Sequence, residues 1–381
     1  MHTNFLSIRK IGLNKEIKEI YLNRFLQSFS LGLIGIFVPI HLMRIGYSLN
    51  QAITYLIMIY LGMMIFVPLA SKISSIIGIK HTISITFPIW ILYFYLLFSL
   101  KFPDSDYLLI GMLYGLANVI YWVPLNTDFS SNVEKIRIGE EFGIMRIIPF
   151  LTNMISPLVG AFIITYMGFD NLIIVVCLLL LISLVPLFLT KDYKFKFGYD
   201  WKKMFNKKHF VFLGDFIMKG IIFGSNVLWP IYVFISFGSR GVINVGLAAS
   251  FGAIGSIIFT FFVGSLCDRY DKVKLLKMGG LANFVVWTSA IIFVSPMAVL
   301  LLSFIKGLLF ILIDMPMFII ACEQTDNKNN IEFMSFREIG LCTGRLIILA
   351  LAFLSILSLK FPTVFLVASI ASLYFTLSRI K

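Results

Sequence analysis

Residues 297–320 read MAVLLLSFIKGLLFILIDMPMFII, a run of 24 residues in which Lys306 and Asp314 are the only charged positions. One transmembrane helix needs about 20 consecutive apolar residues to cross the hydrocarbon layer of a bilayer. Runs of this kind recur along the whole chain, so the sequence predicts an integral membrane protein. The expected spans are 20–43, 48–69, 82–100, 107–128, 142–166, 171–190, 210–236, 244–264, 279–295, 297–320, 337–357 and 363–379.

The composition indicates a surface that faces lipid. The 381 residues are 59% hydrophobic and 13% charged, whereas soluble domains contain about 25% charged residues. A net charge of +13 would suggest nucleic-acid binding on a soluble protein, but membrane proteins collect Lys and Arg in cytoplasmic loops. We therefore expect no nucleic-acid partner. The four cysteines form no CxxC pair, and the sequence predicts neither a disulfide framework, nor a metal site, nor a cofactor.

Lys and Arg are distributed unevenly between the two sides of the expected bundle. With twelve spans, 23 of the 32 lie on the side of the N-terminus, five lie inside spans and four lie on the opposite side. Because cytoplasmic loops are enriched in Lys and Arg, we expect both termini in the cytoplasm and the protein in the cell (plasma or inner) membrane. An odd number of spans would remove this asymmetry.

The longest polar stretch, residues 191–209, carries seven Lys and separates two sets of six spans. We therefore expect four parts: an N-terminal cytoplasmic segment at 1–19, a first six-helix bundle at 20–190, a basic linker at 191–209 and a second bundle at 210–381.

The two halves resemble each other at an offset of 192 residues. Shared Gly and Pro positions are informative because they mark close helix packing and kinks. Two parallel six-helix repeats are the design of one large transporter class. The expected fold is thus an all-α integral membrane protein of about twelve transmembrane helices, in two six-helix pseudo-repeats around a central cavity. The paired positions are Gly32 and Gly224, Gly46 and Gly238, Gly115 and Gly307, Pro124 and Pro316 and, after a slip of one residue, Arg146 and Arg337.

The loop GSLCDRYDK at 264–272, between spans 8 and 9, resembles the GxxxDRxGR loop of the major facilitator superfamily. Gly264 would let two helices approach closely. Asp268 would cap or pair at a helix end, and Arg269 and Lys272 would reach nearby carboxylates or helix ends. The resemblance implies a gating latch that breaks and re-forms as the halves rock, and it covers nearly the whole chain.

The sequence departs from the family pattern at Asp271, in the first-half loop and in span 4. Asp271 stands where the family has a second Gly, and the first-half loop at 70–80 has Ser74 and Ser75 in place of the acid and the Arg. Two equal latches are therefore not expected. Span 5 resembles the family's antiporter pattern, with small residues and Pro157, which favours proton-linked export. Span 4 lacks the Arg that the family's proton-coupled drug exporters usually carry, which weakens that interpretation.

Ionisable side chains inside spans are costly, so each is a candidate functional residue. The second half holds three acid–base pairs, and the members of each pair share a helix face. From the direction of each span, the three cations share one depth, about 12–15 Å from a membrane edge, with the acids nearer the cytoplasm. We expect them to meet in one water-accessible cavity; a purely structural ion-pair network is the alternative. The pairs are Asp215 with Lys219, Asp314 with Lys306, and Glu338 with Arg345.

Amide, aromatic and arginine side chains supply further candidates, mostly in the first half. Amides beside aromatics suit a moderately polar organic ligand, but hydrogen bonds that hold helices together explain the amides equally well. The candidates are Asn23, Arg24, Gln27, Asn118, Trp122, Arg146 and, from span 7, Asn226.

These observations predict a secondary active transporter of a small organic solute that works by alternating access and is coupled to protons. Any of the three carboxyls in the second half could bind the proton, and the cations suit an anionic or strongly polar substrate. A monomer in the lipid bilayer is expected. Import and export both remain open, and a membrane-embedded enzyme or a lipid-handling protein with the same cavity is the rival class. The chain has no HExxH, GxSxG or P-loop motif, so we expect no enzyme activity.

Overall fold

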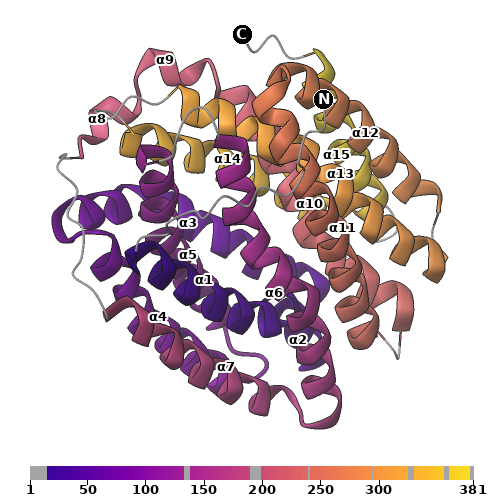
Figure 1. The fold of residues 1–381 in the computed structure, drawn as a ribbon. Coiled ribbons are helices and arrows are strands. Elements are labelled where there is room, and N and C mark those ends of the chain that lie inside the picture. The colour runs from indigo at the N-terminus through magenta and orange to yellow at the C-terminus, as the bar shows by residue number, and fades with distance from the viewer. Residues whose placement is uncertain are drawn as a thin grey trace.

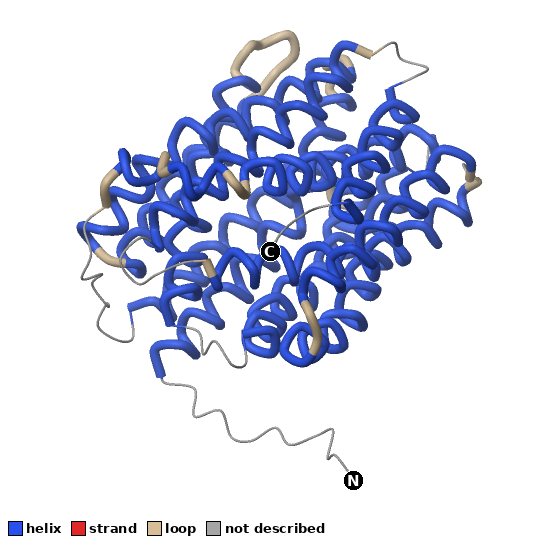
Figure 2. The backbone as a smooth tube through the Cα atoms, turned by 90° about the horizontal axis from the view of Figure 1, so that it is seen from above, coloured by secondary structure: helices blue, strands red, loops and turns tan. Residues whose placement is uncertain are grey.

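The computed structural model describes residues 15–132, 138–188, 199–238, 241–293, 295–324, 330–355 and 360–377. Within these ranges every regular element is a helix (Figure 2). Most of the N-terminal segment expected at 1–19 and the first part of the linker, up to residue 198, lie outside the described residues.

The first half contains α1 (Lys15–Ile34), η1 (Gly35–Phe37), α2 (Val38–Arg44), α3 (Leu49–Ile77), α4 (Ile79–Ser99), α5 (Tyr107–Asn132), α6 (Ile138–Tyr166), α7 (Phe169–Leu184) and η2 (Val185–Phe188). Two short helices follow, α8 (Trp201–Met204) and α9 (Lys207–Phe210). The second half contains α10 (Leu213–Phe237), α11 (Gly241–Arg269), α12 (Lys272–Ile292), α13 (Pro296–Glu323), α14 (Asn330–Leu354) and α15 (Lys360–Leu377).

The expectation of about twelve membrane spans is confirmed. In the described chain, ten segments are long and apolar enough to cross a bilayer. The other two are α7, which has 16 residues and continues as η2, and α14, which carries four charged side chains. Several helices extend past the expected apolar spans into polar sequence: α3 continues to Ile77, and α6 already begins at Ile138.

The two halves pack as two bundles beside each other, coloured indigo to magenta and salmon to yellow in Figure 1. The repeated glycines occupy equivalent places in them. A Cβ on Gly115 of α5 would meet the backbone of α3 at Ile59, and a Cβ on Gly307 of α13 would meet the backbone of α11 at Gly252. Close approach of the equivalent helix pairs thus requires glycine in each half, and the predicted pseudo-repeat is present in the packing.

The two halves are joined at the end of the bundle that also carries α8 and α9, which we call the linker end (Figure 1). The Ser71 and Ser335 hydroxyls lie 2.7 Å apart across α3 and α14. Ser130 of α5 donates a hydrogen bond of 2.6 Å to the Asn330 side chain of α14. At the opposite end, which we call the far end, the described residues form no hydrogen bond between the halves.

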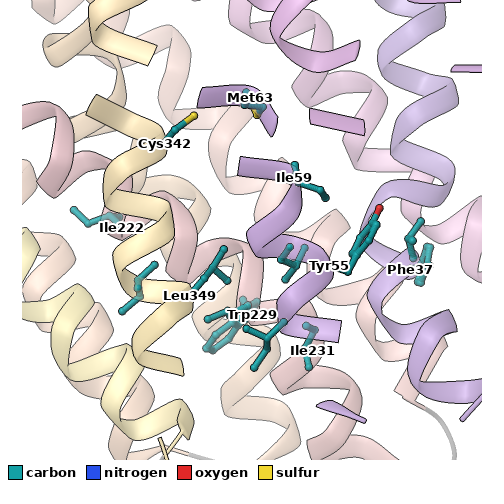
Figure 3. Packing of buried hydrophobic residues seen from close by; sticks show 14 of the residues in the cluster. Phe37, Tyr55, Ile59, Met63, Ile222, Trp229, Ile231, Cys342 and Leu349 are labelled. Carbon is teal, nitrogen blue, oxygen red and sulfur yellow. The ribbon is translucent and has the colours of Figure 1, made fainter. Parts of the chain in front are cut away.

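The main apolar core includes residues of both halves. Figure 3 shows Phe37 and Tyr55 of the first half in the same cluster as Trp229 and Leu349 of the second. Because these side chains pack against one another across the molecule, the core brings the helices that surround the central cavity into contact.

Candidate functional site

A cavity of about 520 Å³ lies between the two halves. Both halves contribute walls, from α1, α3, α5 and α6 on one side and α10 and α14 on the other. The walls are rich in aromatic rings, amides and arginines, while Glu338 is the one carboxylate among the described lining residues. The aromatic and polar lining includes Tyr55, Tyr60, Tyr114, Asn118, Trp122, Asn126, Arg146, Asn153, Phe223, Asn226, Arg337, Glu338 and Arg345.

Asp314 of α13 is paired with cations from two other helices. Its Oδ1 lies 2.8 Å from Lys219 Nζ of α10, and its Oδ2 lies 2.8 Å from Arg146 Nη2 of α6. The Lys219 ammonium also donates to the backbone carbonyl of Asp314, at 3.1 Å. Asp314 and Lys219 are fully enclosed, while Arg146 reaches the cavity. A buried carboxylate that neutralises two cations joins the halves electrostatically, and Arg146 connects this ion-pair group to the cavity.

Glu338 of α14 forms a second charge centre, at the cavity wall. Its Oε1 accepts a hydrogen bond of 3.1 Å from Arg345 Nη1, and its Oε2 lies 3.8 Å from Arg337 Nη1. The Arg345 guanidinium lies 5.0 Å from the ring centroid of Tyr60 on α3. Arg345 therefore contacts both halves, and its pairing with Glu338 is open to competition from a ligand in the cavity.

Lys306 of α13 is held differently from the other cations. Its ammonium lies 3.6 Å from the ring centroid of Trp229 and 4.1 Å from that of Trp287. It lines a second cavity of about 320 Å³. This space shares Asn153 and Asn226 with the lining of the central cavity, so the two adjoin.

The expectation that six charges of the second half meet in one cavity was wrong. Glu338 and Arg345 line the central cavity and Lys306 the adjoining one, whereas Lys219 is enclosed and Asp215 is buried against α15. Lys219 and Asp215 are one turn apart on α10. Lys219 contacts Asp314 of α13, whereas Asp215 contacts Tyr374 of α15. Helix-face arithmetic gives the relative direction of two side chains but not the neighbour that each one meets.

The first-half candidates divide into two groups. Asn118, Trp122 and Arg146 line the central cavity, as does Asn226 of α10. The span 1 candidates do not.

Those span 1 residues are buried among helices instead. Asn23 donates a hydrogen bond of 2.7 Å to the Ser183 carbonyl of α7. The Arg24 guanidinium packs 5.2 Å from the ring centroid of Trp122, and Gln27 is also buried. Asn23 thus follows the alternative interpretation, in which span amides hold helices together.

Residues 264–272, expected as a loop, form the end of α11, a connection of two residues and the start of α12, and they connect the two halves at the linker end. The Asp268 carboxylate accepts hydrogen bonds from the backbone N–H groups of Gly139 (2.8 Å) and Glu140 (3.0 Å), at the start of α6. A Cβ on Gly264 would lie 3.0 Å from the Gly139 carbonyl oxygen, so small residues let α11 and α6 meet here. We call this contact of Asp268 with α6 the latch.

The other two loop candidates do not take part in the latch. Lys272 forms an ion pair of 2.9 Å with Glu323 of α13, within the second half. Arg269 is exposed. The corresponding first-half position, Ser74, donates to the Ser71 carbonyl of its own helix, so the described contacts follow the expectation of unequal latches.

The antiporter-like pattern of span 5 has a packing role in this structure. A Cβ on Gly160 of α6 would meet the Leu33 backbone of α1, and one on Gly246 of α11 would lie 2.8 Å from the Pro157 carbonyl oxygen and 2.9 Å from Ala161 Cβ. Small residues on two faces of α6 thus allow close approach of a helix from each half.

Sequence reasoning missed several residues that the structure brings into play. Arg337 lines the cavity together with its repeat counterpart Arg146, and the repeat itself was a signal that could have placed it there. The Ser71–Ser335 contact and the Asn330 side chain at the linker end gave no such signal, because serine and asparagine are common at helix ends. Within the described chain, no three His, Cys, Asp or Glu side chains are grouped as metal ligands.

Solved structures with a similar fold are membrane transporters. A bacterial homologue of the iron transporter ferroportin, in its outward-facing state, matches with a TM-score of 0.73 and 16% identity over 96% of this chain and 98% of that chain. The transporter FucP in the outward conformation matches with a TM-score of 0.71 and 13% identity over 96% and 99%. The human organic anion transporter MFSD10 (TETRAN) matches with a TM-score of 0.69 and 10% identity over 95% and 98%.

No curated relative matches the sequence. At these identities the structural matches establish the fold alone. The sequence model of the Major Facilitator Superfamily, in contrast, matches residues 20–329. Because that match covers most of the chain and the twelve spans have the arrangement of solved transporters of this type, the protein belongs to the Major Facilitator Superfamily.

Proposed function

We propose that this transporter moves a small organic anion across the cell membrane by proton-coupled alternating access. The observation that carries the proposal is the excess of positive charge around the two cavities. Four cations line them, and a fifth, Lys219, shares Asp314 with the lining residue Arg146; two carboxylates stand against these five. The cations are Arg146, Lys219, Lys306, Arg337 and Arg345, and the carboxylates are Asp314 and Glu338.

A charge at membrane depth costs several kcal/mol unless it is paired or reaches water. Two carboxylates cannot neutralise five cations, so an anionic solute that enters the cavity gains attraction that a neutral or cationic solute does not. The volume of about 520 Å³ lies within the usual range for small-molecule sites, about 300–1,000 Å³. Aromatic and amide walls would pack against and orient the rest of such a solute.

The uneven distribution of Lys and Arg supports the assignment of the linker end to the cytoplasm. In that orientation the latch and the serine contacts close the cytoplasmic side, and we infer an outward-facing state. Inward opening then requires the latch, the Ser71–Ser335 contact and the Asn330 contacts to break together.

Glu338 is the carboxyl that we assign to proton coupling. It lines the cavity and is paired with Arg345. A substrate anion that takes over Arg345 would release Glu338, and the freed carboxylate can then bind a proton. Asp314 is a weaker candidate, because two enclosed ion pairs occupy it.

The test uses proteoliposomes that contain an entrapped pH dye. Carboxylates are offered together with their matched neutral amides, and both solute movement and proton movement are recorded. We expect at least one carboxylate to be transported, its amide not to be, and Arg345→Gln to abolish the transport. Proton movement with the solute indicates symport, and movement against it indicates antiport.

Lys202→Gln, a change at an exposed position of α8, is the matched control and should retain transport. Transport of neutral or cationic solutes with no response to anions would contradict the proposal.

A further inference from the structure

Lys306 is a buried cation that forms no ion pair with a carboxylate of the described residues. Its side chain is 5% exposed, and its ammonium has no hydrogen-bond partner among the described residues. Each of the other four cations around the cavities is within ion-pair distance of a carboxylate, Asp314 or Glu338. The indole faces of Trp229 and Trp287 stabilise the positive charge of Lys306, but its three N–H donors remain unused.

The space beside Lys306 is large enough for a ligand group. The adjoining cavity measures about 320 Å³ and lies between α10, α11 and α13. Gly252 and Gly307 line it, at the place where the backbones of α11 and α13 approach closely. Its apolar wall includes Phe223 and Phe310, whose ring centroids are 4.9 Å apart in an edge-to-face arrangement.

The hydroxyls in this cavity are already engaged. Ser303 accepts a hydrogen bond of 2.9 Å from the Trp229 indole and donates to the Val299 carbonyl. Ser256 donates to backbone carbonyls of α11 and α13. Lys306 is therefore the strongest free donor that faces the space, and an acidic group is the partner that its charge and geometry favour.

We propose that the cavity beside Lys306 is a subsite that binds the acidic group of the transported anion, while the apolar body of the anion packs against Phe223 and Phe310. The inference rests on the proposed function for the identity of the ligand. It deepens that function by adding Lys306, which among the described cations that line the two cavities is the one with no carboxylate partner, to the contact with Arg345 in the adjoining cavity. The substrate class that follows is a small carboxylate, or a comparable monoanion, with a planar apolar body.

The experiment uses fluorescence quenching in the purified full-length protein. Trp122 and Trp201 are replaced by Phe, and the enclosed Trp90 and Trp287 remain as a constant background, so that Trp229, which lines the cavity, reports on it. Iodide is the anionic quencher and acrylamide the neutral one, at constant ionic strength. We expect the ratio of iodide to acrylamide quenching to fall by roughly fivefold to tenfold in Lys306→Met, because the local accumulation of anions is lost.

Lys306→Arg should retain most of the ratio of iodide to acrylamide quenching, because it keeps the positive charge. Lys306→Gln serves as the neutral variant if the methionine variant does not fold. Benzoate should compete with iodide in the parent protein, and benzamide should not. An unchanged ratio in the neutral variants would overturn the subsite and would show that the two indoles alone satisfy Lys306.

The two proposals can fail separately. If quenching beside Lys306 depends on anions but the protein transports no organic anion, the anion subsite stands and the proposed function is refuted. Transport of a carboxylate that is sensitive to Arg345→Gln, with a quenching ratio that does not respond to Lys306, would refute the subsite alone.

Discussion

Replacement of Asp268 by asparagine should loosen the linker end. The Asp268 carboxylate accepts two backbone N–H groups at the start of α6, at 2.8 and 3.0 Å. A helix N-terminus favours a negative charge, and asparagine keeps only one acceptor oxygen and no charge. The change alters no contact within α11 other than those of this side chain.

The magnitude follows from the bonds that are lost. Hydrogen bonds to charged groups contribute about 1.5–3 kcal/mol when well buried, and the half-exposed position of Asp268 reduces this value. We expect the closed linker end to lose about 1–2 kcal/mol relative to the open state. A difference of this size raises the ratio of open to closed molecules by about 5–30-fold.

The assay measures the reactivity of Cys322, which is enclosed in the apolar cluster between the halves at the linker end. The other three cysteines are replaced by alanine. A water-soluble thiol reagent should modify Cys322 about 5–30-fold faster in Asp268→Asn. Asp271→Asn is the matched control, because Asp271 accepts the Val273 N–H at the start of α12, within one half. Equal rates in the two variants would refute the latch.

Three further predictions concern topology, packing and the buried charges. Reporter fusions at Lys381 and within 191–209 should both give a cytoplasmic signal, and an external signal at either place would contradict the assigned orientation. Gly307→Leu should lower the free energy of unfolding in detergent by about 1–3 kcal/mol or more, and the melting temperature with it, because its Cβ would meet a backbone carbonyl of α11. In the control Gly35→Ala, whose Cβ would meet only a tyrosine hydroxyl at 3.5 Å, the melting temperature should hardly change. Asp314→Asn should lower the free energy of unfolding by about 3–5 kcal/mol, since two cations lose their carboxylate. An unchanged melting temperature would show that those ion pairs contribute no net stability.

The sequence alone predicted the membrane class, the twelve spans and the two halves. Whether a segment crosses a bilayer depends on consecutive residues, and a helix satisfies its own backbone hydrogen bonds within that segment. The pseudo-repeat was also readable, because close helix packing requires glycine at specific positions. Gly115 and Gly307 show this directly, since each lies against the backbone of the equivalent neighbouring helix.

The partners of the buried charges were decided only by the tertiary structure. Lys219 and Arg146 lie 95 and 168 positions from Asp314 along the chain, and their meeting depends on how three helices are rotated and placed. That rotation is set by many small packing contacts between helices, none of which can be seen in a single span. Spacing along one helix could show that Asp215 and Lys219 share a face, but only packing could bring one to α15 and the other to Asp314. Packing likewise leaves Lys306 facing two tryptophans, with no carboxylate of the described residues beside it.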